Sequence, residues 1–253
     1  MRLPLLAFFV GIVMLPGCQE KDFDLANPDG SFVIAKTPYT QGNYEIALNR
    51  LGEFKTKFPY SSYALEAELL IANSYYELAR YGEAVVSYEQ FIKLHPKHLQ
   101  GAFAQFRIGQ SYWEQAPKEV DREQDLSAKA ISEWDKLLVA YPHSEYVGEA
   151  KELSLKGRRR IAESQEFIAK FYCKQEIWHA CAHRYIALAE AYNHTFPDLV
   201  KKALQKAAVA LEKLADQKVS QDKKDDANLY LKAMAPEDMR KRAAVFREEA
   251  GKL

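Results

Sequence analysis

The chain has 253 residues, of which 48% are hydrophobic and 28% are charged. Its 35 basic and 35 acidic side chains cancel, so the formal net charge at pH 7 is zero. This balance does not favour nucleic acid or another polyanion as a partner. The one dense basic run, at residues 156–160, contains no aromatic side chain and is predicted to be a solvated helix face.

The N-terminal segment has the features of a secretory signal. Arg2 follows the first methionine, an apolar run covers residues 3–15, and a Pro-Gly pair precedes Cys18. The run is shorter than the roughly 20 apolar residues that a transmembrane helix needs. Residues 1–17 are therefore predicted to be a signal peptide, and a retained membrane anchor is the alternative.

Residues 15–18, which read Leu-Pro-Gly-Cys, resemble the bacterial lipobox, in which the cysteine is acylated and begins the mature protein. Several acyl chains on one protein hold it stably at a membrane. We therefore expect a covalent lipid on Cys18, no other cofactor, and a lipidated tether at residues 18–30. Gln19 follows the cysteine, and in lipoproteins of this type a residue other than Asp favours the outer membrane.

Residues 64–96 have the pattern of one tetratricopeptide repeat, a pair of antiparallel helices with a period of about 34 residues. The small side chains of Ala72 and Ala84 allow the two helices to approach closely. Tyr75 and Tyr88 fill the space beside them, and a proline ends the second helix.

Prolines recur at the ends of the predicted second helices on either side of this unit. Pro59 lies 37 residues before Pro96, and Pro142 lies 46 residues after it, because a polar insertion at residues 116–125 lengthens the third unit. One such unit cannot bury its apolar face alone, so stacked neighbours are expected. We predict an all-α fold, an α-solenoid of about five tetratricopeptide-type helix hairpins.

The predicted organisation has three parts after the tether. Residues 31–142 form repeats one to three, and Pro38 limits the first helix. Residues 143–235 form repeats four and five, and residues 236–253 form a charged C-terminal helix that opens at a proline. The fifth hairpin is predicted to pair residues 199–215 with residues 225–233.

The first helices of the repeats present one face that the predicted core stripe does not use. In the third unit this face is strongly apolar for a row exposed to solvent. Its aromatic side chains either line an open concave surface or belong to the core, and the sequence leaves both interpretations open. The predicted peptide-binding residues are Tyr63, Leu69, Asn73, Tyr76, Phe103, Phe106 and Trp113.

Two cysteines besides Cys18 lie close together in the sequence, at Cys173 and Cys181. They fall on either side of a predicted turn, and an oxidising compartment permits a disulfide when the Cα atoms lie within about 7 Å. The sequence does not fix that separation. We expect free, buried thiols.

His179 and His183 are four residues apart, a spacing that can present two zinc ligands on one helix face. Ala180 occupies the position where a metalloprotease carries its glutamate, and no third ligand is evident. The sequence also has no nucleophile elbow or phosphate-binding loop. We predict neither a metal site nor enzymatic activity.

Four further segments carry a specific resemblance. They lie at residues 58–63 (FPYSSY), 91–96 (FIKLHP), 120–122 (VDR) and 141–146 (YPHSEY). With the lipobox and the Gly-Asn-Tyr at residues 42–44, their order resembles the BamD family, also called YfiO or ComL. These are tetratricopeptide lipoproteins of the outer-membrane β-barrel assembly machinery. The chain departs from the family pattern at Pro38, before Phe196 and in the charged C-terminal region.

This resemblance implies a non-enzymatic scaffold, anchored by its lipid at the periplasmic face of the outer membrane. The N-terminal repeats would receive unfolded outer-membrane β-barrel proteins. The C-terminal repeats would dock the periplasmic domains of the barrel subunit BamA, and accessory lipoproteins of the machinery are further candidate partners. A different tetratricopeptide envelope lipoprotein, such as a secretin pilotin or a cell-wall coordination factor, is the alternative.

The resemblance also implies a docking residue. Arg184 follows Trp178 at the spacing of a tryptophan–arginine pair that contacts BamA in this family. A surface ion pair of Arg184 with Glu163 or Glu190 is the alternative, and such a pair contributes only about 0–1 kcal/mol.

Overall fold

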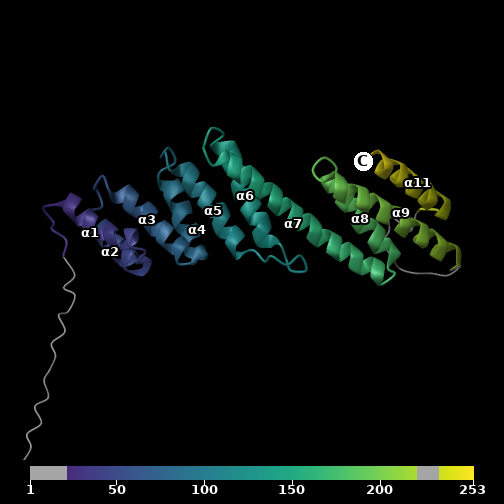
Figure 1. Ribbon diagram of the computed structural model, residues 1–253, viewed down its shortest axis with the longest axis horizontal. Helices are drawn as coiled ribbons and strands as arrows, with labels where there is room; N and C mark the ends of the chain where they lie inside the picture. Colours follow the sequence, from purple (N-terminus) through teal and green to yellow (C-terminus); the bar gives the residue numbers. More distant parts are fainter. Residues whose placement is uncertain (1–21, 221–233) are drawn as a thin grey trace, which may run out of the picture. The chain divides into compact units, whose positions relative to one another are not determined.

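The computed structural model describes residues 22–220 and 234–253. The predicted signal peptide, Cys18 and the predicted helix at residues 225–233 lie outside these ranges. Within them all regular structure is helical, which confirms the predicted all-α solenoid of tetratricopeptide-type hairpins (Figure 1). The helices are α1 (Pro28–Thr40), α2 (Tyr44–Lys57), α3 (Ala64–Glu77), α4 (Tyr81–Leu94), α5 (Gly101–Gln115), α6 (Asp125–Ala140), α7 (Val147–Lys174), α8 (Trp178–Tyr192), α9 (Pro197–Ser220) and α11 (Pro236–Lys252).

The helices group into two compact units, one that ends at Ile71 and one that begins at Ala72. The first unit has an aromatic core, in which Phe32 and Phe54 are buried with their ring centroids 5.2 Å apart. Tyr63 stacks on Phe32 at a centroid distance of 4.6 Å. These contacts join α1, α2 and the segment before α3.

The first helix starts earlier and ends later than predicted. The side chain of Asn27 caps it by accepting a hydrogen bond from the backbone N–H of Gly30, and Pro28 occupies the first helical position. The expected limit at Pro38 was wrong, because the helix continues to Thr40. Pro38 lies in the last turn, so its missing N–H removes only one hydrogen bond near the end of the helix. Its carbonyl accepts hydrogen bonds from Gln41 and Asn43.

In the second unit, each helix packs against the next one along the chain. α4 contacts α5, α5 contacts α6, and the series continues through α7, α8 and α9 (Figure 1). The last described helix, α11, packs on α9. The predicted charged C-terminal helix from Pro236 is therefore confirmed, and Arg247 joins it to Glu212 of α9 by a bidentate ion pair.

One indole organises the contact between α5 and α6. Trp134 has no solvent exposure and belongs to a buried cluster with Phe106 and Leu137. A Cβ atom added at Gly109 of α5 would lie 2.4 Å from the indole Nε1. The two helices can therefore approach this closely only because residue 109 has no side chain.

We predict that Gly109→Ala lowers the free energy of unfolding by about 1–3 kcal/mol, because the buried indole cannot move away from a new methyl group. Urea denaturation measures this change. Gly148→Ala is the matched control, since a Cβ at Gly148 meets no atom within 4 Å. Its effect should stay within about 0.5 kcal/mol of zero, and an equal loss in both variants would contradict the packing argument.

The basic run at residues 156–160 is not the simple solvated face that we predicted. Arg158 pairs with Asp135 of α6 at 2.5 Å. Arg159 donates from both terminal nitrogens to Asp198 at the start of α9, over 2.8 and 2.7 Å, and from Nε to Glu163. The hydrogen bonds from Arg159 lower the pKa of Asp198 to about 2. The run therefore ties α7 to two other helices.

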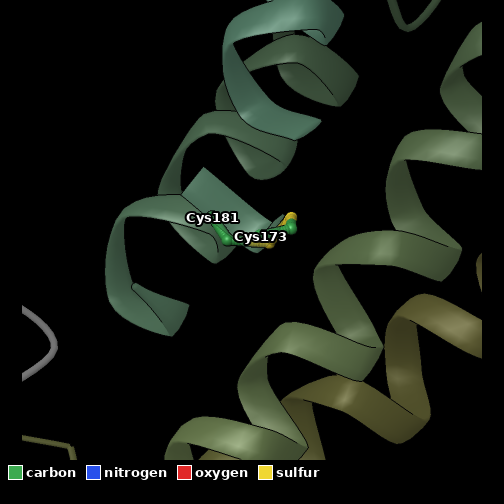
Figure 2. Close-up of a disulfide and its surroundings, with 2 residues drawn as sticks. All are labelled: Cys173 and Cys181. Atoms are coloured by element: carbon green, nitrogen blue, oxygen red, sulfur yellow. A yellow bond between two sulfur atoms is a disulfide. The ribbon is translucent and has the colours of Figure 1, made fainter. Parts of the chain in front are cut away.

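Cys173 and Cys181 form a disulfide, so the expectation of free thiols was wrong (Figure 2). Their Cα atoms lie 5.0 Å apart. The reason is the tight turn between α7 and α8, in which Glu176 adopts a positive φ of 58° and Ile177 donates its backbone N–H to the carbonyl of Tyr172. This turn brings the end of one helix beside the start of the next.

We predict that a reducing agent lowers the free energy of unfolding by about 2–3 kcal/mol, the value expected for a covalent loop of this length. The cysteines are eight positions apart. The double variant Cys173→Ala/Cys181→Ala should show the same loss and should no longer respond to the reductant. Urea denaturation with and without dithiothreitol tests both statements, and a double variant that still responds would place the effect elsewhere.

Candidate functional site

The predicted peptide-binding residues are divided between the two units. Tyr63 and Leu69 belong to the first unit, where both side chains are half-buried and Tyr63 is stacked on Phe32. The remaining residues belong to the second unit. They are Asn73 and Tyr76 on α3 and Phe103, Phe106 and Trp113 on α5.

Two of these residues are part of the core, as the alternative interpretation allowed. Phe106 is only 4% exposed, and its ring stacks on Tyr146 at a centroid distance of 5.2 Å. Tyr146 comes from the connection before α7, which the periodicity of α5 alone could not reveal. Asn73 is 9% exposed and accepts a 2.5 Å hydrogen bond from the hydroxyl of Tyr88. Neither side chain lines an open surface.

The other three residues lie beside cationic side chains. The guanidinium of Arg107 lies over the ring of Tyr76 at 4.3 Å and over that of Phe103 at 5.4 Å. Glu77 lies 3.8 Å from the same guanidinium. Both aromatic rings are half-buried, and burial raises the pKa of Tyr76. Arg107 therefore holds two aromatic side chains in fixed positions on α3 and α5.

Trp113 has a similar environment one turn from the end of α5. The guanidinium of Arg160 lies 3.7 Å from the centre of the indole, and the ammonium of Lys156 lies 6.0 Å from it. Arg160 also donates a hydrogen bond to the carbonyl of Pro117 at 3.3 Å. Burial lowers the pKa of Arg160, against an opposing effect of Glu119.

Arg184 is exposed on α8 and lies over the ring of Tyr172 at 5.7 Å. Of its two predicted ion-pair partners, Glu163 is paired with Arg159 instead. Glu190 is exposed, and across residues 22–220 and 234–253 Arg184 makes no ion pair. The structure thus leaves the Arg184 charge available on the surface, while Trp178 packs against the core of α8, α9 and α11.

Other candidate sites give no indication of chemistry. Within the described residues, no group of three or more His, Cys, Asp or Glu side chains has the geometry to hold a metal ion. An open groove of about 750 Å³ lies between α6 and α7, lined by residues that include Ile131, Val139 and Arg158, and none of the predicted binding residues line it. In the part of the chain that the structure describes, no helix has both the length and the apolar character required to cross a membrane.

Sequence reasoning missed the cations of this surface. Arg107, Lys156 and Arg160 contact the predicted aromatic residues, but the apolar stripe of α5 contains none of them. One signal was present, because Arg107 follows Phe103 by four residues, which places both on the same helix face. Arg160 comes from a different helix, and no spacing within one helix indicates its contact with Trp113.

The fold and the site define a tetratricopeptide-type protein whose predicted binding face is aromatic and cationic. The family described as outer membrane lipoprotein, YfiO, matches residues 26–227 of the chain. This match covers well over half of the sequence, so the chain belongs to the YfiO family of outer membrane lipoproteins.

Three relatives carry the same name, outer membrane protein assembly factor BamD. The chain is 23% identical over 225 residues to that of Vibrio cholerae, covering 85% of this chain and 92% of the relative. Identity is 26% over 199 residues for Rickettsia prowazekii, with 74% and 75% covered. It is 27% over 208 residues for Xylella fastidiosa, with 74% and 68% covered.

Among solved structures, a tetratricopeptide repeat protein from Parabacteroides merdae aligns with a TM-score of 0.38 and 14% identity. The alignment covers 90% of this chain and 93% of that one.

Proposed function

We propose that this protein is an outer-membrane assembly factor, anchored through a lipid on Cys18 at the periplasmic face, that binds unfolded β-barrel proteins and docks the barrel subunit BamA. Membership of the YfiO family supports this function. The relatives named as outer membrane protein assembly factors, aligned over most of their length, support it further. The lipobox at residues 15–18 supports the anchor.

The observation that carries the proposal is the row of aromatic side chains held by guanidinium groups on α3 and α5. Tyr76, Phe103 and Trp113 keep part of each ring accessible. Arg107 and Arg160 fix these rings, so little side-chain entropy is lost when a partner binds. Unfolded β-barrel strands alternate apolar and polar side chains, and an extended chain of this kind can place its apolar residues on such a row.

We predict that a photo-crosslinking amino acid at Tyr76 captures unfolded barrel proteins in cells, because this ring lies on the accessible row. Lys93 is the control position, since it is exposed on α4 and belongs to no aromatic cluster. A crosslinker at Phe106 should capture less than one at Tyr76, because Phe106 is buried. Equal capture at Tyr76 and Lys93 would refute the binding row.

Docking of BamA is proposed to use Arg184. This guanidinium has no carboxylate partner among the residues that the structure describes, and it can form a bidentate pair with a carboxylate of another protein. Replacing one member of a desolvated interfacial pair costs roughly 2–5 kcal/mol, which is more than about tenfold in affinity.

We predict that Arg184→Glu reduces the recovery of BamA with the tagged protein by more than about tenfold and leaves the thermal midpoint unchanged. Arg159 is unsuitable as a control, because its reversal would break the ion pairs that join α7 to α9. Lys151→Glu is the matched control, since Lys151 is exposed on α7 and forms no ion pair within the described residues. Equal recovery by both variants would exclude Arg184 as the docking residue.

Purification from outer membranes separates the proposed function from its alternative. Recovery of BamA supports the assembly factor, whereas recovery of a secretin ring would support a pilotin.

Mass spectrometry of the mature protein tests the anchor. We predict an N-terminus at Cys18 that carries acyl chains, and an unmodified N-terminus at another residue would exclude the lipid anchor.

A further inference from the structure

One face of α7 carries two cations followed by two exposed aromatic rings. Lys156, Arg160, Phe167 and Phe171 are separated by four, seven and four positions. At about 100° per residue these positions fall within about 60° of one another around the helix, over a length of about 22 Å. We call this set the α7 face.

In the described part of the chain, neither cation of the α7 face is paired with a carboxylate, although Glu119 acts electrostatically on Arg160 from outside ion-pair distance. Arg160 and Lys156 both lie over Trp113, yet within the described residues neither makes an ion pair. The two preceding arginines differ, because Arg158 and Arg159 are each paired with a carboxylate. Arg160 has five N–H donors, and its one acceptor among residues 22–220 and 234–253 is the carbonyl of Pro117.

A half-buried guanidinium without a hydrogen-bonded carboxylate is an unfavourable arrangement that an anion in direct contact would relieve. Burial removes water from Arg160 and costs free energy as long as the charge is uncompensated. A carboxylate placed beside Arg160 and Lys156 would accept charge-assisted hydrogen bonds from both. The indole of Trp113 below them would exclude water on one side of that contact.

The aromatic end of the α7 face is accessible. The side chain of Phe167 is 47% exposed and that of Phe171 is 54% exposed, although α7 buries other residues at the same level of the helix. Two exposed rings four positions apart form a single apolar ridge. Contiguous exposed apolar patches that are bordered by polar residues mark interaction sites.

We propose that the α7 face binds an extended polypeptide segment that carries a carboxylate and, three residues away, an apolar side chain. Arg160 and Phe167 are seven positions apart, about 10 Å along the helix. An extended chain in the polyproline II conformation advances about 3.1 Å per residue and has three residues per turn, so side chains three positions apart lie on the same side of the chain, about 9 Å from each other. The carboxylate binds Arg160 and Lys156, and the apolar side chain packs on Phe167 and Phe171.

This inference rests on the proposed function, because it assigns a chemistry to the segment of the unfolded barrel protein that lies beyond Trp113. It states that the protein distinguishes acidic from neutral segments of equal hydrophobicity. The row on α3 and α5 alone has no feature that would make this distinction, since Arg107 already has Glu77 as a neighbour.

The test uses two synthetic peptides with blocked termini, Phe-Thr-Ser-Asp-Ser-Thr-Phe and its counterpart with Asn in place of Asp. The central residue has a phenylalanine three residues away in both directions, so either chain orientation satisfies the spacing. Fluorescence anisotropy with the full-length protein should show the Asp peptide binding about tenfold more tightly than the Asn peptide. Equal affinities for the unmodified protein would overturn the proposal without any variant.

Variants then test which residues cause the preference for the Asp peptide. Arg160→Gln should abolish it, whereas the matched control Arg158→Gln should keep it, because Arg158 faces α6 and pairs with Asp135. Phe167→Ser/Phe171→Ser should weaken both peptides by the same factor. A preference for the Asp peptide that survives Arg160→Gln would overturn the assignment. If Arg160→Gln does not fold, the same comparison of the two peptides is made with Lys156→Gln, which should reduce the preference.

Failure of this inference and failure of the proposed function are distinguishable. Capture of barrel proteins at Tyr76 without any preference for the Asp peptide would leave the proposed function intact and refute the α7 face. A preference for the Asp peptide without capture at Tyr76 would support the α7 face and refute the proposed substrate.

Discussion

The packing of the second unit depends on one helix, α7, which buries two different faces. In its first half, Ala150 and Gly157 lie against α5 and α6, where a Cβ at Gly157 would meet the side chain of Ile131. In its second half, Ala162 and Ala169 belong to the core that α8 and α9 build. The two buried faces differ by about 120° around the helix. A single continuous helix thereby joins two packing environments, and the side that neither environment covers stays accessible.

Although the net charge of the chain is zero, three consecutive arginines of α7 each have a specific partner on another helix. Arg158, Arg159 and Arg160 are consecutive, so their side chains point in three directions about 100° apart. The first reaches α6, the second reaches the start of α9, and the third lies on an indole of α5. Each exposed pair contributes little alone. Together they position α7 against its neighbours at the level where its buried face changes.

The helices could be predicted from the sequence because small residues and prolines recur at the spacing that close helix pairs require. The ends of α2 and α4, each two residues before a recurring proline, follow directly from this pattern. Whether an aromatic residue faces the core or the solvent could not be predicted in the same way. Phe106, for example, is buried by Tyr146, which belongs to a later connection. Arg160 and Trp113 meet across two helices, and the pairing of Cys173 depends on the geometry of one turn. These contacts are long-range or depend on exact backbone conformation, and local periodicity contains neither kind of information.

The disulfide at the corner between α7 and α8 has a consequence for how the second unit opens under native conditions. Hydrogen exchange and proteolysis reach buried amides through partial openings, in which groups of helices separate as cooperative units. A covalent bond between Cys173 and Cys181 prevents α7 and α8 from separating at this corner. The contacts of α9 with α8, and those of α11 with α9, are noncovalent. We therefore expect partial openings that expose the core around Tyr185 to begin with the departure of α9 and α11, while the α7–α8 corner stays closed.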